Sequence, residues 1–273
     1  VEVSTAPDLT QRGFDVAYET SSGDALAVAC FGTEAVYRVW DGASWSATSS
    51  ITLGVSTNCE WIKLAADPTS DEIILTARDA TTGVNDYQAL VWNGSSWGNS
   101  LILGGQVTVT NEGIALEYEE SGDQAILAVS NSSLNSFVWS AWNGSAWSST
   151  STVAIGNYFA NGRLVRDVGS DNLAICYVDL NSDIGYARWT GSAWAGAGAV
   201  IDAAGNSNNS RPVSCEFETT TSRDGYIMIP YSDTIAAEYV FYNGSVLSSP
   251  ALTVTTVSDS AEVRTARTGD GNI

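Results

Sequence analysis

Histidine is absent from this 273-residue chain, and lysine occurs once, as Lys63. The lack of histidine removes the commonest general base, the commonest metal ligand and the side chain that titrates near neutral pH. The sequence also contains no P-loop, and without histidine it has no Ser-His-Asp or Cys-His arrangement for nucleophilic catalysis. We therefore expect a protein that is not an enzyme and that needs no cofactor.

Basic residues are scarce as a class. Eleven Lys and Arg stand against 31 Asp and Glu, which gives a formal net charge of −20 at pH 7. Nucleic acid is excluded as a partner, because phosphate binding relies on clustered Lys and Arg. Anionic membrane surfaces are disfavoured for the same reason. Membrane insertion is not expected either, since no apolar run approaches the roughly 20 residues that span a bilayer.

Tryptophan, in contrast, is abundant and recurs in one motif. The motif is Trp, then Asp, Asn or Thr, then Gly, two small residues and a second Trp. Its four copies are Trp40 to Trp45, Trp92 to Trp97, Trp142 to Trp147 and Trp189 to Trp194, and a decayed copy begins at Tyr242. The copies start 52, 50, 47 and 53 residues apart. Periods near 50 residues indicate propeller blades or a similar array.

A second marker, an aspartate in a small polar turn, follows the same period. Its copies are Asp24, Asp71, Asp123, Asp171, Asp224 and Asp270. Between these markers each unit divides into four strands, which in the first unit are residues 14–19, 25–30, 35–40 and 50–53. Asn-Gly and Asp-Gly between aromatic and β-branched runs predict tight hairpins. The second strand of each unit is apolar on both faces, as stacked blades require. The sequence thus predicts an all-β fold, a β-propeller of four-stranded repeats.

The two ends of the chain continue the repeat. Val1 to Ser4 resembles the last strand of a preceding unit, and Ala261 to Arg267 repeats the first strand of a unit. Counted in this way, residues 1–273 hold five full units and part of a sixth in a single repeat-built domain. We expect this domain to be an excised or mature part of a longer chain.

The four cysteines occupy equivalent positions of different units. Cys30 and Cys176 lie in second strands, whereas Cys59 and Cys215 lie at the start of the following unit's first strand. Three pairings are open to four cysteines, and the repeat favours Cys30 with Cys59 and Cys176 with Cys215. The alternative is four buried thiols. Disulfides would place the protein in an oxidising location, extracellular or at the cell surface.

The sequence resembles the propeller-type repeats of large secreted and cell-surface proteins of prokaryotes. The resemblance rests on the Trp-Asn-Gly-x-x-Trp turns and on the strings from Gly13 to Leu26 and from Leu64 to Ile73. It implies a surface-exposed ectodomain, usually without an assigned reaction. The Asp-box of sialidases (Ser-x-Asp-x-Gly-x-x-Trp) is related in kind, but here the turn aspartate and the Trp motif fall in different hairpins.

Three functions are compatible with these observations. The first is an extracellular structural or adhesive module that contacts other surface proteins or copies of itself. The second is a multivalent carbohydrate-binding, lectin-like propeller. Its candidate ligand-binding residues are Trp40, Trp45, Trp92, Trp97, Trp142, Trp147, Trp189 and Trp194. Packing across the hairpin explains the same tryptophans without a ligand.

The third function is a sialidase-like glycoside hydrolase, which requires two carboxylates at one cleft. Glu117, Glu119 and Glu120 are the densest acidic group. Ca²⁺ is the one metal that the turn aspartates could bind, and 67–72 and 167–172 are the segments richest in oxygen ligands. Aspartate in a turn more often accepts hydrogen bonds from its own backbone, so no metal site is expected.

Overall fold

The computed structural model describes residues 11–79, 86–104, 111–122, 124–203, 205, 211–220, 222–233, 236–243, 245, 248, 251–254 and 262–266. The predicted strand at Val1 to Ser4 and the turn residues Asp123 and Asp270 lie outside these ranges. The described residues are all-β, without a helix, and so include none long and apolar enough to cross a membrane.

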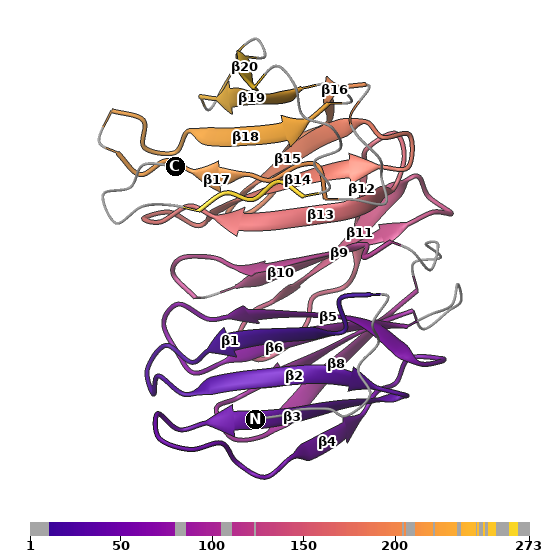
Figure 1. Cartoon of the computed structure of the whole chain (residues 1–273), viewed down its shortest axis with the longest axis vertical. Coiled ribbons are helices and arrows are strands. Elements are labelled where there is room, and N and C mark those ends of the chain that lie inside the picture. Colours follow the sequence, from indigo (N-terminus) through magenta and orange to yellow (C-terminus); the bar gives the residue numbers. More distant parts are fainter. Residues whose placement is uncertain are drawn as a thin grey trace. The chain divides into compact units, whose positions relative to one another are not determined.

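The strands form five four-stranded sheets, each built from four strands that follow one another in the chain (Figure 1). The first holds β1 (Phe14–Tyr18), β2 (Ala25–Phe31), β3 (Glu34–Trp40) and β4 (Ser49–Thr52). The second holds β5 (Cys59–Ala66), β6 (Ile73–Asp79), β7 (Tyr87–Trp92) and β8 (Trp97–Leu103). The third holds β9 (Ile114–Tyr118), β10 (Ala125–Asn131), β11 (Ser136–Trp142) and β12 (Ser151–Ala154).

The fourth sheet holds β13 (Phe159–Arg166), β14 (Asn172–Asp179), β15 (Ile184–Thr190) and β16 (Trp194–Asp202). The fifth holds β17 (Glu216–Phe217), β18 (Ile227–Ser232), β19 (Ala237–Tyr242) and β20 (Ala251–Val254). A sixth unit begins beyond the fifth sheet, where Glu262 forms a parallel bridge with Arg211. These repeated antiparallel sheets are propeller blades, and the predicted β-propeller fold is confirmed.

The blades belong to two compact units. One comprises residues 1–133 and 138–151, and the other comprises residues 134–137 and 152–273. Within the first unit β1 lies beside β5 and β5 beside β9, and within the second β13 lies beside β17. Within each unit, the first strand of a blade therefore adjoins the first strand of the next blade.

The second strands are buried on both faces, as their apolar sequences predict. Every residue of β6 is buried, and so is every residue of β2 except Phe31 at its end. A strand in the middle of a blade has a neighbouring strand on each edge, and the side chains on both of its faces are buried. Alternation of apolar and polar residues is lost there for that reason.

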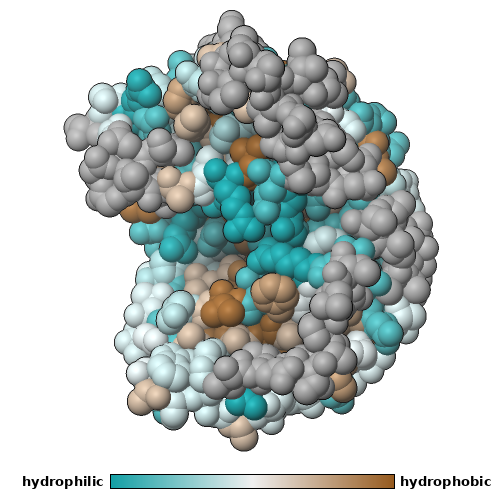
Figure 2. Space-filling view, viewed as in Figure 1, coloured by the Kyte–Doolittle hydropathy of each residue, from teal (hydrophilic) through white to brown (hydrophobic). Residues whose placement is uncertain are grey.

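β1 differs from the other first strands because its apolar side chains are exposed. Phe14, Val16 and Tyr18 alternate along one face of this strand, and all three are accessible to solvent. Figure 2 shows hydrophobic surface, in brown, in the lower half of the view, over the region where Figure 1 draws β1.

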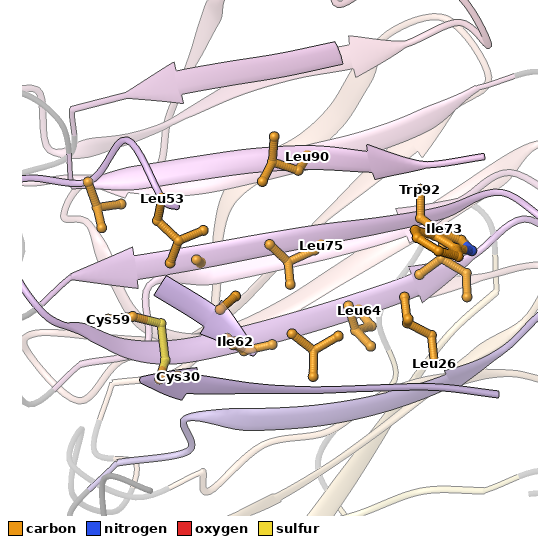
Figure 3. Packing of buried hydrophobic residues seen from close by; sticks show 14 residues of the cluster. Leu26, Cys30, Leu53, Cys59, Ile62, Leu64, Ile73, Leu75, Leu90 and Trp92 are labelled. Carbon is orange, nitrogen blue, oxygen red and sulfur yellow. A yellow bond between two sulfur atoms is a disulfide. The ribbon is translucent and has the colours of Figure 1, made fainter. Parts of the chain in front are cut away.

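The core between the first two blades is formed by facing side chains of both (Figure 3). Leu26 and Val28 of β2 pack in one cluster with Ile62 and Leu64 of β5 and with Trp92 of β7. Burial of large aliphatic side chains contributes about 1.5–3 kcal/mol each. The first two blades are therefore held together mainly by their apolar faces, and a second such cluster joins the fourth and fifth blades.

The structure contains both disulfides that the repeat predicts. Cys30 of β2 is joined to Cys59 of β5 with a Cα–Cα distance of 5.3 Å, and Cys176 of β14 to Cys215 with 6.0 Å. Figure 3 shows the first of them beside Ile62, linking the second strand of one blade to the first strand of the next. No free cysteine remains.

Candidate functional site

The tryptophan motifs form hairpin turns, as predicted. Trp92 pairs with Trp97 across β7 and β8, and Trp40 forms an antiparallel bridge with Trp45. The turn depends on the residue after the first Trp: Asn93 Oδ1 accepts hydrogen bonds from the backbone N–H groups of Ser95 (3.1 Å) and Ser96 (2.9 Å). The next residue is always Gly, because its φ is positive, 86° at Gly94.

In the first motif the residue that accepts the hydrogen bonds of the turn is charged. Asp41 replaces the Asn there and accepts hydrogen bonds from the N–H groups of Ser44 (2.7 Å) and Ala43 (2.9 Å). These donors, Ser44 first, hold the pKa of the Asp41 carboxyl below its usual value of 3.8. The N–H groups of the hairpin thus favour the ionised form of this carboxyl group.

The two rings of each motif lie against one another with nearly constant geometry. Their centroids are 5.6 Å apart in the pair Trp40 and Trp45, and 5.4 Å apart in the pair Trp92 and Trp97. The third and fourth pairs have 5.6 and 5.7 Å. Tilted and edge-to-face contacts at this range are favourable, worth about 0.5–1.5 kcal/mol beyond burial. The structural role expected for these pairs is therefore present in all four motifs.

The first tryptophan of each later motif is buried. Trp92 Nε1 donates to Glu19 Oε1 at 2.6 Å, and Trp142 Nε1 donates to Glu72 Oε1 at 2.5 Å. These two bonds connect neighbouring blades. Trp189 is also buried, against Trp194 of its own motif. None of the three rings has a face at the surface on which a ligand could stack. The sequence predicted the first and second tryptophans alike as candidate ligand-binding residues. It could not separate them, because burial depends on the surrounding structure and not on the motif.

The second tryptophan is half-exposed in every motif, at Trp45, Trp97, Trp147 and Trp194. Neighbouring groups fix these rings. Trp147 Nε1 donates to the backbone oxygen of Asn99 at 2.8 Å. Trp97 has Tyr37 edge-on at 5.7 Å, and Trp194 has Phe137 edge-on at 5.0 Å. Trp97, Trp147 and Trp194 are thus held in place and partly exposed to solvent beside short polar hairpins.

The first blade has an additional feature, an open surface hollow of about 240 Å³. Its lining residues are Val16, Tyr18, Ala25, Trp40 and Trp45. Three of the five are aromatic, so the hollow can accept a flat or saturated ring. Trp40 is the only first tryptophan of the four motifs that is half-exposed.

Comparisons with protein families and with curated proteins find no match, whereas several solved structures are similar. The BP39L lectin from Burkholderia pseudomallei has a TM-score of 0.64 at 10% identity, over 90% of this chain and 71% of the lectin. The SapL1 lectin, in complex with alpha methyl fucoside, has a TM-score of 0.54 at 13% identity, over 91% and 84%. The NanB sialidase from Streptococcus pneumoniae has 0.55 at 12%, over 94% and 63%. Identities this low show a shared fold alone.

The turn aspartates that were weighed as Ca²⁺ ligands bind protein donors. Asp67 Oδ1 accepts the N–H of Thr69 (2.8 Å), and its Oδ2 accepts the hydroxyl of Ser70 (2.6 Å). Asp71 Oδ1 accepts the N–H groups of Ser21 (2.7 Å) and Ser22 (2.8 Å) of the preceding blade. Among the residues that the structure describes, no group of three or more Asp, Glu, Cys or His could hold a metal ion.

Sequence reasoning missed the residues that connect blades. Glu19 and Glu72 accept from buried tryptophans of the following blade, and Glu72 also accepts from the hydroxyl of Tyr118 at 2.7 Å. Asp71 was predicted to bond within its own turn, but it caps the turn of another blade. The repeat was the one sequence signal for these contacts, because each joins residues of adjacent units, 46 to 73 residues apart in the chain.

Proposed function

We propose that this chain is a non-catalytic, carbohydrate-binding propeller with several repeated sites. Each site is centred on the second tryptophan of a hairpin motif. The observation that carries the proposal is the different environment of the two rings in the second, third and fourth motifs: the first tryptophan is buried, and the second is half-exposed and held in place. Trp97, Trp147 and Trp194 are the ligand-stacking residues.

The physical basis is the charge distribution of the indole ring. Its face is negative, and the C–H groups on one side of a sugar ring are weakly positive. A ring that is already immobilised loses little conformational freedom on binding. The Ser and Asn side chains of the hairpin lie beside the ring and can hydrogen-bond to sugar hydroxyls. Single sites of this kind are weak, but several on one molecule gain through effective concentration on a glycan-coated surface, by about 10²–10⁴.

The similar structures support this reading over a structural or adhesive role, because two of the three are lectins and one was solved with alpha methyl fucoside. The sialidase has the same fold, so the fold by itself does not separate binding from hydrolysis. The absence of histidine and the division of the Asp-box features between two hairpins favour binding. A structural or adhesive role takes second place.

The charge of the chain narrows the ligand class. A net charge of −20 repels sialylated and sulfated glycans. Arginines that could offset this charge face carboxylates of the chain: Arg12 pairs with Asp15 at 2.7 Å, and Arg223 with Glu218 at 3.2 Å. We therefore assign the sites to neutral sugars. The two disulfides support an extracellular location, where such glycans are displayed.

A glycan array carrying neutral and sialylated glycans tests the proposal. The wild-type chain is expected to bind a subset of the neutral glycans. The triple variant Trp97→Ala/Trp147→Ala/Trp194→Ala should lose at least about tenfold in apparent affinity, because the avidity of several sites disappears together. Phe31→Ala removes an exposed aromatic outside the motifs and should leave binding unchanged.

The corresponding triple Phe variant guards against loss of folding. It keeps an aromatic ring at each position, so it should unfold like the wild type and retain part of the binding. Absence of binding to any glycan by the folded wild type would overturn the proposal, as would equal binding by the Ala variant. Cleavage of a glycoside on the array would overturn the non-catalytic function and favour the glycoside hydrolase.

A further inference from the structure

The second tryptophan has different neighbours in the second and third blades. Tyr37, three residues before the first tryptophan of its own motif, lies edge-on to Trp92 and Trp97 of the next blade, with centroids 5.7 Å from each. In the second blade the residue three places before Trp92 is Ala89. This place of the repeat therefore supplies no ring to Trp147 of the third blade.

Trp147 is held instead by the backbone of the second blade. Its Nε1 donates to the backbone oxygen of Asn99 at 2.8 Å. Asn99 lies in β8, two residues after Trp97, and it is exposed. A half-exposed indole ring of one blade thus adjoins an exposed residue of the preceding blade that carries a carboxamide.

The backbone of Asn99 has an uncommon conformation. Its φ is 49°, in the left-handed region that residues other than Gly rarely adopt. The pairing of β7 with β8 shifts register here, so that Asn99 and Ser100 together lie opposite Leu90. This arrangement is a β-bulge, which turns side chains out of the regular alternation of a strand and is over-represented beside functional sites.

Glycine would satisfy this backbone without any side chain. In the fourth blade the residue two places after the second tryptophan is Gly196, whose φ is 68°. The pairing of β15 with β16 also shifts register there, between Tyr186 and Arg188. The bulge therefore explains the positive φ at this place of both blades, but it does not explain why the second blade carries the carboxamide of Asn99.

The neighbours of Asn99 in the chain are fixed. Gln88 Nε2 donates to the hydroxyl oxygen of Ser100 at 2.8 Å, and Gln88 Oε1 accepts the N–H of Gly54 at 2.6 Å. Gln88 itself is buried. On the other side of Asn99, Trp97 packs within its own motif. Asn99 is therefore held in position before a ligand arrives, which lowers the entropic cost of binding.

We propose that Asn99 determines which sugars bind at Trp147. The inference rests on the proposed function and builds one of its sites from two blades. The sugar stacks on the indole ring of Trp147, and the Asn99 carboxamide donates through Nδ2 and accepts through Oδ1. A donor and an acceptor side by side match two adjacent hydroxyls of one sugar. The ligand class is thus a neutral sugar with free hydroxyls on neighbouring ring carbons.

NMR titration of the nitrogen-15-labelled chain tests the inference, because the indole N–H signal of Trp147 reports this site alone. The signal is assigned with Trp147→Phe. The probes are the methyl glycosides of glucose, galactose and mannose, each compared with its 3-deoxy analogue, which lacks both vicinal hydroxyl pairs of the ring. At least one parent glycoside should shift the Trp147 signal. Its 3-deoxy analogue should bind at least about fivefold more weakly, because hydrogen bonds to Asn99 are lost.

Asn99→Gly is the decisive variant, since Gly adopts a positive φ freely and keeps the backbone oxygen that accepts Trp147 Nε1. It should bind the parent glycoside at least about fivefold more weakly, and its affinities for the parent and the 3-deoxy analogue should agree within about twofold. Asn135→Gly is the matched control. Asn135 is exposed in the turn between β10 and β11, and its φ is also 49°. This control should bind both sugars as the wild type does.

The outcomes separate this inference from the proposed function. Binding at Trp147 that is unchanged in Asn99→Gly would overturn the role of Asn99 and leave the stacking site in place. Equal affinity of the wild type for parent and 3-deoxy sugars would do the same without relying on a variant. Shifts confined to Trp97 or Trp194 would overturn the two-blade site but not carbohydrate binding. Absence of any shift would overturn the inference, whereas the glycan array decides the proposed function. Thermal unfolding and the Trp147 signal without sugar verify that Asn99→Gly keeps the fold and the indole contact.

Discussion

Trp92 and Glu19, 73 residues apart in the chain, meet at the junction of the first two blades, where the indole Nε1 donates to the carboxylate Oε1 at 2.6 Å. Both side chains are buried. The contact recurs one unit later between Trp142 and Glu72. A hydrogen bond is directional, so this contact fixes the orientation of one blade relative to the next more precisely than apolar packing alone does.

Removal of the acceptor should destabilise the fold. Glu19→Ala leaves the buried Nε1 of Trp92 without its partner, and loss of a buried bond to a charged group costs about 1–3 kcal/mol. Glu19→Gln keeps an acceptor and should recover part of the loss. Urea unfolding followed by tryptophan fluorescence measures both. Glu34→Ala, a half-buried glutamate of the same blade, should change the free energy of unfolding by less than about 0.5 kcal/mol. Equal effects at Glu19 and Glu34 would contradict the assignment.

Much of the fold follows from the period of the sequence. Each hairpin needs only a short local signal, Asp, Asn or Thr followed by Gly between strand-forming residues, and five such signals, 47 to 53 residues apart, define the blades. The disulfides follow by the same reasoning. Cys30 and Cys59 occupy the same parts of the repeat as Cys176 and Cys215, and both pairs are joined, so their proximity is a property of the repeat.

The candidate site depends on contacts that the period does not encode. Trp92 and Trp97 are both tryptophans of the second motif, yet Trp92 is buried and Trp97 is half-exposed. Both rings contact Tyr37 of the preceding blade, but only Trp92 also donates to the buried Glu19 of that blade. Likewise, Val16 occupies an apolar position of an alternating strand, as a core residue would, but it lies at the surface. Its burial would require a neighbouring protein segment, which the sequence of the strand does not specify.

The disulfides should add measurably to stability. Chain-entropy estimates give about 3–4 kcal/mol for each bridge, since they join residues 29 and 39 positions apart. The double variant Cys30→Ala/Cys59→Ala should therefore lower the free energy of unfolding by about this amount, and reductant should have a similar effect on the wild type. Peptide mapping without reduction should recover Cys30 with Cys59 and Cys176 with Cys215. A Cys30–Cys215 peptide, or free thiols in the native protein, would refute the pairing.

Asp167 and Asp41 should respond to pH in opposite directions. Burial raises the pKa of the Asp167 carboxyl above 3.8, although hydrogen bonds from Ser170 and Asn172 offset part of the effect. The folded state then binds this proton more tightly than the unfolded state does. The free energy of unfolding therefore decreases as pH rises through the raised pKa and Asp167 becomes ionised. Asp41 is the reverse case, because its lowered pKa contributes stability that is lost as pH falls through that value.

Two variants measure these slopes. Relative to the wild type, Asp167→Asn should become more stable as pH rises from 3.8 through the raised pKa of Asp167, and Asp41→Asn should become less stable as pH rises through the lowered pKa of Asp41 to 3.8. Each variant removes one negative charge, so the general repulsion within a chain of net charge −20 changes equally in both. The comparison therefore isolates the local environments. Urea unfolding at each pH gives the differences, and slopes of the same sign for both variants would show that net charge, rather than burial and hairpin hydrogen bonds, controls the pH dependence.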